Sequence, residues 1–126
     1  MADYQIVNLN DVNSSSSQTD VDARFTRDIL GSKDLGVSRF SYQPGFKAVM
    51  AHSHKVQEEI YVVLSGSGRL LLDQQVESIK EGDVIRVAPQ VVRAFEAGNQ
   101  GLSILAIGGN KPEGGDGQRF DAVWPD

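Results

Sequence analysis

The sequence predicts a single all-β domain, either a sandwich or a barrel, and three observations lead to this prediction. A chain of 126 residues with 40% hydrophobic residues is long enough for one domain with its own core. Short apolar runs recur at intervals of roughly 8–12 residues, with turn-forming residues between them, as in many β-sandwiches and barrels. No long amphipathic helical pattern interrupts the series.

The expected strands follow the apolar runs along the chain. Glu59–Leu64, for example, is rich in β-branched and aromatic residues, a composition typical of strands. Ser65–Gly68, with the sequence SGSG, is expected to be a hairpin turn between two of them. Asp20–Leu30 is expected to include a helical turn. The expected strands are Tyr4–Val7, Val37–Tyr42, Phe46–His54, Glu59–Leu64, Arg69–Asp73, Val76–Ile79, Asp83–Ala88, Arg93–Ala97 and Leu102–Gly108.

The chain divides into a central barrel and two peripheral segments. Residues 1–36 are expected to form an N-terminal strand and a polar, serine-rich loop that pack on the barrel. Residues 37–108 hold the barrel, and residues 109–126 form a C-terminal tail. The tail opens as a glycine-rich loop and ends in Phe120, Val123 and Trp124, which are expected to dock on the barrel or on a partner subunit.

Composition and charge argue against several classes of function. The net charge of −5 and the pI near 4.9 argue against binding nucleic acid, which needs a basic face. The absence of cysteine excludes disulfides and thiolate metal sites. No apolar run approaches the roughly 20 residues of a membrane span, and the N-terminus lacks a signal pattern. We therefore expect a cytoplasmic protein with no membrane partner.

Both histidines of the chain lie two residues apart, just ahead of two glutamates. Side chains alternate along a strand, so His52 and His54 are expected to share a face. The same alternation places Phe46, Ala48 and Met50 on that face. Glu58 and Glu59 point to opposite faces. If Glu59 faces the histidines, Tyr61 and Val63 face inward with it. Two imidazoles and one carboxylate then converge, a ligand set suited to divalent first-row metals. A hydrogen-bonded polar cluster without metal is the alternative.

The segment from His52 to Gly66 resembles the first motif of the cupin family. That motif has glycine, five residues, His-x-His, three or four residues, glutamate, six residues and glycine. Here six residues follow Gly45, and the spacing of His52, His54, Glu59 and Gly66 then matches throughout. The motif selects Glu59 over its neighbour, in agreement with the strand argument.

The second cupin motif is only partly matched. It begins well at Gly82, but alanine, glutamine, arginine and alanine replace its proline, second glycine, histidine and asparagine. Arg93 takes the position of the third metal-binding histidine. The resemblance covers roughly residues 37–108 and implies a cupin double-stranded β-helix, that is, a jelly-roll barrel enclosing a pocket and commonly dimeric.

Arg93 cannot ligate a metal, because a guanidinium stays protonated and has no free lone pair. Three arrangements are open. Arg93 forms a bidentate pair with Glu59 and no metal binds; or His52, His54 and Glu59 hold a metal while Arg93 recognises an anionic ligand; or Arg93 points to solvent. In the second arrangement Tyr61, Phe95 and Met50 are expected to line the ligand pocket with Arg93.

Two functions of different classes therefore remain open. The first is a pocket with a 2-His-1-Glu site for a divalent first-row transition metal (Fe, Mn, Ni or Zn), in an oxygenase or isomerase acting on a small anionic compound. The second is a metal-free module that binds or senses a small molecule, with an Arg93–Glu59 pair in place of the metal. Because barrel edges need covering, we also expect a homodimer in which Tyr4–Val7 pairs with the neighbouring barrel.

Overall fold

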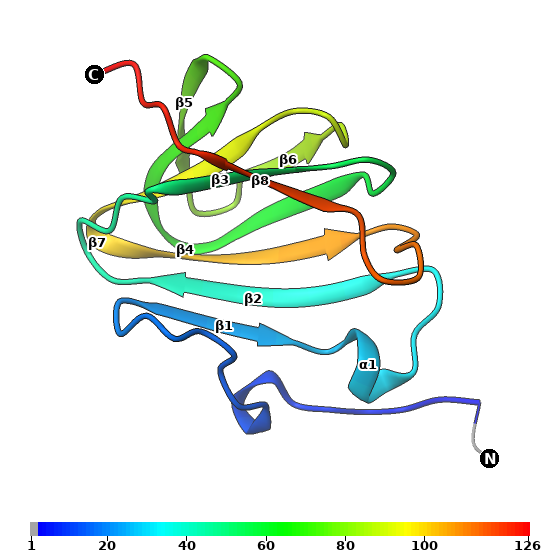
Figure 1. Ribbon diagram of the computed structural model, residues 1–126. Helices are drawn as coiled ribbons and strands as arrows, with labels where there is room; N and C mark the ends of the chain where they lie inside the picture. Colours follow the sequence, from blue (N-terminus) through cyan, green and yellow to red (C-terminus); the bar gives the residue numbers. More distant parts are fainter. Residues whose placement is uncertain (1–2) are drawn as a thin grey trace.

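The computed structural model describes residues 3–126, whose regular secondary structure consists almost entirely of strands (Figure 1). A 3-10 turn (Leu9–Asp11) and the single-turn helix α1 (Arg27–Leu30) are the helical elements of this part of the chain. None of its helices is long and apolar enough to cross a membrane. The strands are β1 (Val21–Phe25), β2 (Gly36–Tyr42), β3 (Met50–His54), β4 (Glu59–Leu72), β5 (Gln75–Lys80), β6 (Val84–Val87), β7 (Arg93–Gly108) and β8 (Gly117–Asp121).

The two long strands β4 and β7 organise the fold. The first half of β4 and the last half of β7 lie in one layer, with the antiparallel strand order β1-β2-β7-β4-β6. The last half of β4 and the first half of β7 lie in the other layer, with the order β8-β3-β7-β4-β5. Figure 1 shows β1 and β2 in one layer and β3 and β8 in the layer opposite. Because β4 and β7 run through both layers, the sheet curls on itself, and the predicted double-stranded β-helix is confirmed.

The predicted hairpin turn at Ser65–Gly68 is wrong, because this segment lies inside β4. The register of β4 against β7 shifts on both sides of the segment, which marks irregularities where the strand bends. A Cβ atom on Gly68 would overlap the carbonyl oxygen of Glu96, so the close approach of the two backbones requires glycine. The glycines therefore bend one strand from layer to layer instead of ending it. For the same reason the two strands predicted in Arg93–Gly108 are one strand, β7.

The N-terminal part of the chain differs from prediction in three places. Asp20–Leu30 contains the expected helical turn, α1, but also β1, which was not predicted and pairs with β2. Tyr4–Val7 is not part of a strand in the single chain, and Ile6 is 89% exposed. Pairing of this segment with a neighbouring barrel therefore stays a prediction. β3 begins at Met50, so strand parity does not extend back to residue 46.

The C-terminal tail contributes a strand as well as a docked tryptophan. β8 pairs along the whole length of β3. Trp124 packs against the cluster of Ala51, Leu71 and Ala94, and its Nε1 donates to the carbonyl oxygen of Ala48 at 2.9 Å. Docking of Trp124 on the barrel is confirmed. Phe120 and Val123 are 42% and 76% exposed in the single chain, so their docking on a partner subunit stays a prediction.

A hydrophobic core fills the space between the two layers. Its side chains come from the inner faces of β4, β5, β6 and β7, with Phe40 and Tyr42 of β2 packed against them. Tyr61 belongs to this core and is 2% exposed, yet its hydroxyl reaches the side chain of Glu59. The core thus ends directly against the predicted site. Its fully buried members are Tyr61, Val63, Leu70, Ile79, Val87, Phe95, Ala97, Leu102, Ile104 and Ala106.

Replacing Gly68 by alanine is expected to lower the free energy of unfolding by about 1–3 kcal/mol, because the added methyl group would push β4 away from β7. Gly109→Ala is the matched control, since its Cβ would lie 3.6 Å from the nearest atom, the carbonyl oxygen of Glu58. Urea unfolding of both variants checks this. Equal stability of the two variants would contradict the close approach.

Candidate metal centre

The two histidines share one face of β3, as strand parity predicts. Ala51 and Ser53, which alternate with them, are buried on the other face of the strand. The imidazole rings of His52 and His54 meet edge to face, with their centroids 5.1 Å apart. The side chain of His54 is 13% exposed and that of His52 is 42% exposed, so the pair leads from the barrel interior towards solvent.

Glu59 opens β4 and turns its side chain towards both imidazoles. Its Oε1 lies 3.5 Å from Nε2 of His52 and 3.3 Å from Nε2 of His54. The neighbouring Glu58 points outward, with a side chain 55% exposed and paired with Arg86. The prediction that Glu59 faces the site and Glu58 faces out is confirmed.

Ligand atoms of His52, His54 and Glu59 all lie within 4.8 Å of one another. Two ligands held about 2.1 Å from a tetrahedral metal are roughly 3.4 Å apart, close to the separations of each Nε2 from Oε1. The carboxylate also has a second oxygen, Oε2, which forms no hydrogen bond with residues 3–126. This oxygen is not fully buried, and the Glu59 side chain is 14% exposed. The donor set therefore fits a divalent metal.

Asp116 holds the second nitrogen of His54 and was missed from the sequence. Its Oδ1 lies 2.9 Å from Nδ1 of His54, which leaves Nε2 free to face Glu59. A carboxylate on the distal nitrogen is the usual partner of a metal-binding histidine, because it fixes the ring and the tautomer. A single carboxylate between glycines carries no sequence signal for this role.

Asp116 also ties together the loop between β3 and β4. Its Oδ2 accepts the backbone N–H groups of Val56 and Gln57, each at 2.8 Å, and Oδ1 accepts the side-chain amide of Gln57 at 2.8 Å. Burial opposes ionisation, but these hydrogen bonds and the one from His54 outweigh it and hold the pKa of Asp116 well below its ordinary value. The carboxylate is therefore charged at neutral pH.

Arg93 crosses the barrel from the start of β7 and is completely buried, with 0% of its surface exposed. Its Nη2 donates to Oε1 of Glu59 at 2.7 Å. Its Nε donates to the hydroxyl of Tyr61 at 3.1 Å, and that hydroxyl donates to the same Oε1 at 2.6 Å. Its Nη1 donates to the carbonyl oxygens of Pro89 and Val91 at 3.0 and 2.7 Å.

These contacts decide between the arrangements considered for Arg93. The alternative in which it points to solvent is wrong, because the side chain is fully buried. An arginine–glutamate pair is present, but it is not bidentate: one guanidinium nitrogen bonds Glu59 directly and a second reaches it through Tyr61. All three guanidinium nitrogens have partners inside the protein, so contact of Arg93 with an anionic ligand stays a prediction.

The charges around Glu59 keep it ionised. Burial alone would raise the pKa of Glu59, but hydrogen bonds from His52, His54 and Tyr61 and the charge of Arg93 hold it far below its usual range. Burial, together with the nearby Glu59, raises the pKa of Tyr61 well above its ordinary value, so the phenol keeps its proton and donates it. The hydrogen bond to Glu59 raises the pKa of His54.

The remaining residues predicted to line the pocket lie at different depths. Tyr61 contacts Glu59 directly, whereas Phe95 is buried behind it and packs edge to face on its ring, 5.0 Å between centroids. Met50 is 47% exposed at the start of β3, opposite Asp121 of β8. The structure thus brings Tyr61 to the predicted ligands, keeps Phe95 behind it in the core, and leaves Met50 at the exposed end of β3.

A cavity of about 530 Å³ opens beside two of the three predicted ligands, His54 and Glu59. It is bounded by the inner faces of β2 and β7, by α1 and by the loop that precedes β8. This volume is within the range of small-molecule sites in proteins. A cavity therefore lies next to two of the predicted ligands, and the binding of a small molecule in it stays a prediction.

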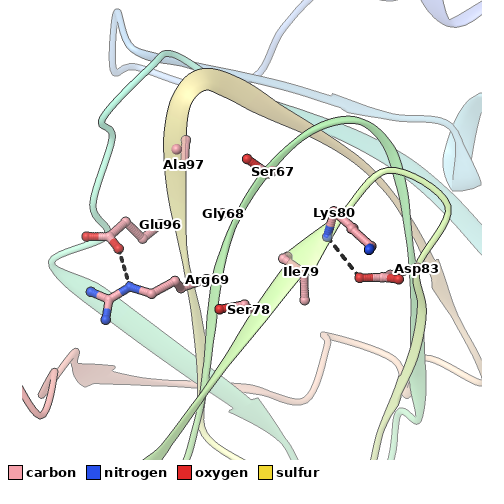
Figure 2. Close-up of a pocket in the computed structure, with 10 residues that line it drawn as sticks. Ser67, Gly68, Arg69, Ser78, Ile79, Lys80, Asp83, Glu96 and Ala97 are labelled. Atoms are coloured by element: carbon pink, nitrogen blue, oxygen red, sulfur yellow. Dashed lines mark hydrogen bonds and ion pairs between the residues drawn. The ribbon is translucent and has the colours of Figure 1, made fainter.

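A second cavity, of about 520 Å³, lies between β4, β5 and β7 (Figure 2). Within it Arg69 donates to Glu96, and the backbone N–H of Lys80 donates to the side chain of Asp83. None of the predicted ligands lines it, so it is separate from the candidate metal centre.

The comparisons with known proteins agree with this architecture. The family model described as Cupin domain matches residues 38–108. An uncharacterized protein of Methanocaldococcus jannaschii is 39% identical over 57 residues, which are 44% of this chain and 46% of that protein. The match therefore spans about half the length of that relative.

Solved structures with the same fold cover nearly the whole chain. A cupin protein from Bacteroides fragilis is 28% identical, with a TM-score of 0.72, and the match covers 89% of this chain and 88% of that one. A variant of oxalate decarboxylase from Bacillus subtilis is 18% identical, with a TM-score of 0.75, covering 92% of this chain and 32% of that one. At that identity the likeness shows the fold alone. Because the family model covers more than half of the sequence, this chain belongs to the cupin family.

Proposed function

We propose that this protein is a metal-dependent cupin enzyme, an oxygenase or isomerase that acts on a small anionic compound. His52, His54 and Glu59 would hold a divalent first-row transition metal, with Fe, Mn, Ni and Zn all suited to these ligands. The observation that carries the proposal is the convergence of their ligand atoms within 4.8 Å, with both Nε2 atoms directed at one carboxylate. The fixed Nδ1 of His54 supports it.

Three protein ligands leave coordination positions free, where a bound metal would polarise a substrate oxygen or take up a small molecule. The residues of the chain define the surroundings of that position. Asp116 orients His54, and Tyr61 and Arg93 fix Glu59 from the core side. The cavity beside His54 and Glu59 provides room for the organic compound.

Glu59→Gln is expected to weaken metal binding by about 100-fold or more, since it removes the charged ligand, whereas Glu58→Gln on the outer face should leave it unchanged. The measurement is elemental analysis and metal titration of protein purified without a histidine tag. Circular dichroism confirms that both variants are folded. Equal effects of the two substitutions, or wild-type protein that takes up no metal, would contradict the proposal.

Asp116→Asn should lower metal affinity by about 10- to 100-fold, because an amide in place of the carboxylate weakens the hold on Nδ1 of His54. Glu113→Gln removes a charge from the same loop and serves as the control. Competitive titration against a chelator gives the two affinities. If Asp116→Asn binds metal as tightly as the control, the second nitrogen of His54 does not matter to the centre.

A metal-free binding or sensing module is the second candidate, and one observation favours it. The 2.7 Å contact of Arg93 with Oε1 of Glu59 places a permanent positive charge where the family's second motif has a metal-binding histidine. In this case the guanidinium replaces the metal as the partner of Glu59, and the barrel pocket binds its ligand without one.

Arg93→His separates the two candidates, because it restores a third imidazole beside His52, His54 and Glu59. In the metal-free case, metal content should rise from near zero in wild-type protein towards one ion per chain in the variant. In the metalloenzyme case, wild-type protein already holds about one ion, and the variant holds the same amount with similar or higher affinity. Stoichiometry by elemental analysis decides. A wild-type protein without metal and a folded variant that gains none would contradict both.

A further inference from the structure

The cavity beside the candidate metal centre contains two cations that are not neutralised by the protein. Arg27 of α1 and Lys111 of the loop before β8 both line it. Among residues 3–126 neither forms an ion pair with a carboxylate. The carboxylates in the lining are Glu59, which is already paired with Arg93, and the exposed Asp28. With Glu59 neutralised by Arg93, two cations of the lining face one carboxylate, Asp28, and the cavity keeps an excess of positive charge.

Arg27 is held in place by the backbone of two facing glycines. Gly36 of β2 and Gly108 of β7 are paired in register, and a Cβ on Gly36 would overlap the guanidinium of Arg27. Its Nη2 donates to the carbonyl oxygens of Gly109 at 2.8 Å and Gly108 at 3.4 Å, and to Oε1 of Gln57 at 3.3 Å. The absence of side chains at these two positions leaves the space in which the guanidinium packs against the backbone of the sheet.

Part of the guanidinium remains free to bind a ligand. Its Nη1 donates one hydrogen bond, to the carbonyl oxygen of Lys33 at 3.3 Å, and Nε has no acceptor among residues 3–126. This unbonded Nε is not fully buried. All the acceptors of Arg27 are neutral oxygens, which satisfy hydrogen bonds but do not cancel its charge. A ligand anion would form a charge-assisted hydrogen bond here.

The rest of the cavity wall is largely apolar, which indicates the kind of ligand that would fit. Phe25 and Phe40 meet edge to face, with centroids 5.5 Å apart, and Ile29 and Ala106 add aliphatic surface. Phe25 and Ile29 are 47% and 58% exposed, so a ligand would bury apolar surface that the chain leaves open. The wall suits an aryl or alkyl group that carries one anionic end.

Arg27, which would bind the anionic end of the ligand, lies next to the candidate metal centre. Gly108, whose carbonyl accepts from Arg27, is the register partner of Glu59. A chain of hydrogen bonds also leads from Arg27 through Gln57 and Asp116 to His54. A small compound can therefore contact Arg27 while another part of it reaches the face formed by His54 and Glu59.

We propose that Arg27, assisted by Lys111, is the carboxylate-binding residue of the cavity and selects small carboxylic acids with an apolar body. The role of such an acid as substrate rests on the proposed function, but its recognition by Arg27 does not require metal. This assignment gives the anionic ligand a partner other than Arg93, whose nitrogens are all engaged within the barrel.

The test compares phenylacetate with its neutral analogue phenylacetamide by calorimetric titration at low ionic strength. Wild-type protein should bind the acid more tightly. Arg27→Gln should weaken binding of phenylacetate by about 10- to 100-fold and change that of phenylacetamide little, because only the acid loses a charge-assisted bond. Asp28→Asn, at an exposed position, should strengthen phenylacetate binding by about 2- to 3-fold, because it removes from the cavity a negative charge that repels the phenylacetate anion.

Each titration is run on protein stripped of metal and on protein loaded with manganese(II). If no manganese binds but the difference between wild type and Arg27→Gln persists, the proposed metal function fails and the carboxylate site stands. If manganese binds but a folded Arg27→Gln variant retains its phenylacetate affinity, the carboxylate site is overturned. It is also overturned if wild-type protein shows no preference for the acid. Should Arg27→Gln fail to fold, the Asp28→Asn result decides, and unchanged or weaker binding overturns the site.

Discussion

The buried carboxylate of Glu59 is the constraint on which the site depends. Four side chains direct polar atoms at its Oε1: two imidazoles from β3, the phenol of Tyr61 and the guanidinium of Arg93. An unpaired charge at this depth would be costly, so the partners from the opposite layer are a condition of the fold as well as of the chemistry. The pairing holds the two layers together at the point where the core ends.

The long strands explain how residues far apart in the sequence reach one carboxylate. β4 begins with Glu59 and β7 begins with Arg93, and the two strands run antiparallel through both layers. Their first residues therefore lie in different layers, and the long side chain of Arg93 spans the interior between them. The register partner of Arg93 on β3 is His52, which brings the histidine pair to the same side. β4 can pass from one layer to the other because Gly68, which has no side chain, allows its backbone to approach β7 closely at the bend.

Local patterns predicted the parts of the site that lie within one strand. Alternation along the strand placed His52 and His54 on one face and separated Glu59 from Glu58, because strand parity is a short-range property. The extent of β4 was missed, since glycines at a bend resemble glycines at a turn. Asp116 and Arg27 were missed as well, because their partners lie far away in the sequence. The partners of Asp116 are 59–62 residues distant and those of Arg27 are 30–82 residues distant, which no local pattern can indicate.

An X-ray absorption spectrum of metal-loaded protein tests the central claim most directly, because it reports the atoms that bind the metal. If His52, His54 and Glu59 form the centre, the spectrum should show two imidazole nitrogens and carboxylate oxygen in the first shell. The imidazole signals should fall to one in a His52→Ala variant. A first shell without imidazole, or an unchanged spectrum in that variant, would show that any bound metal lies elsewhere and would contradict the account.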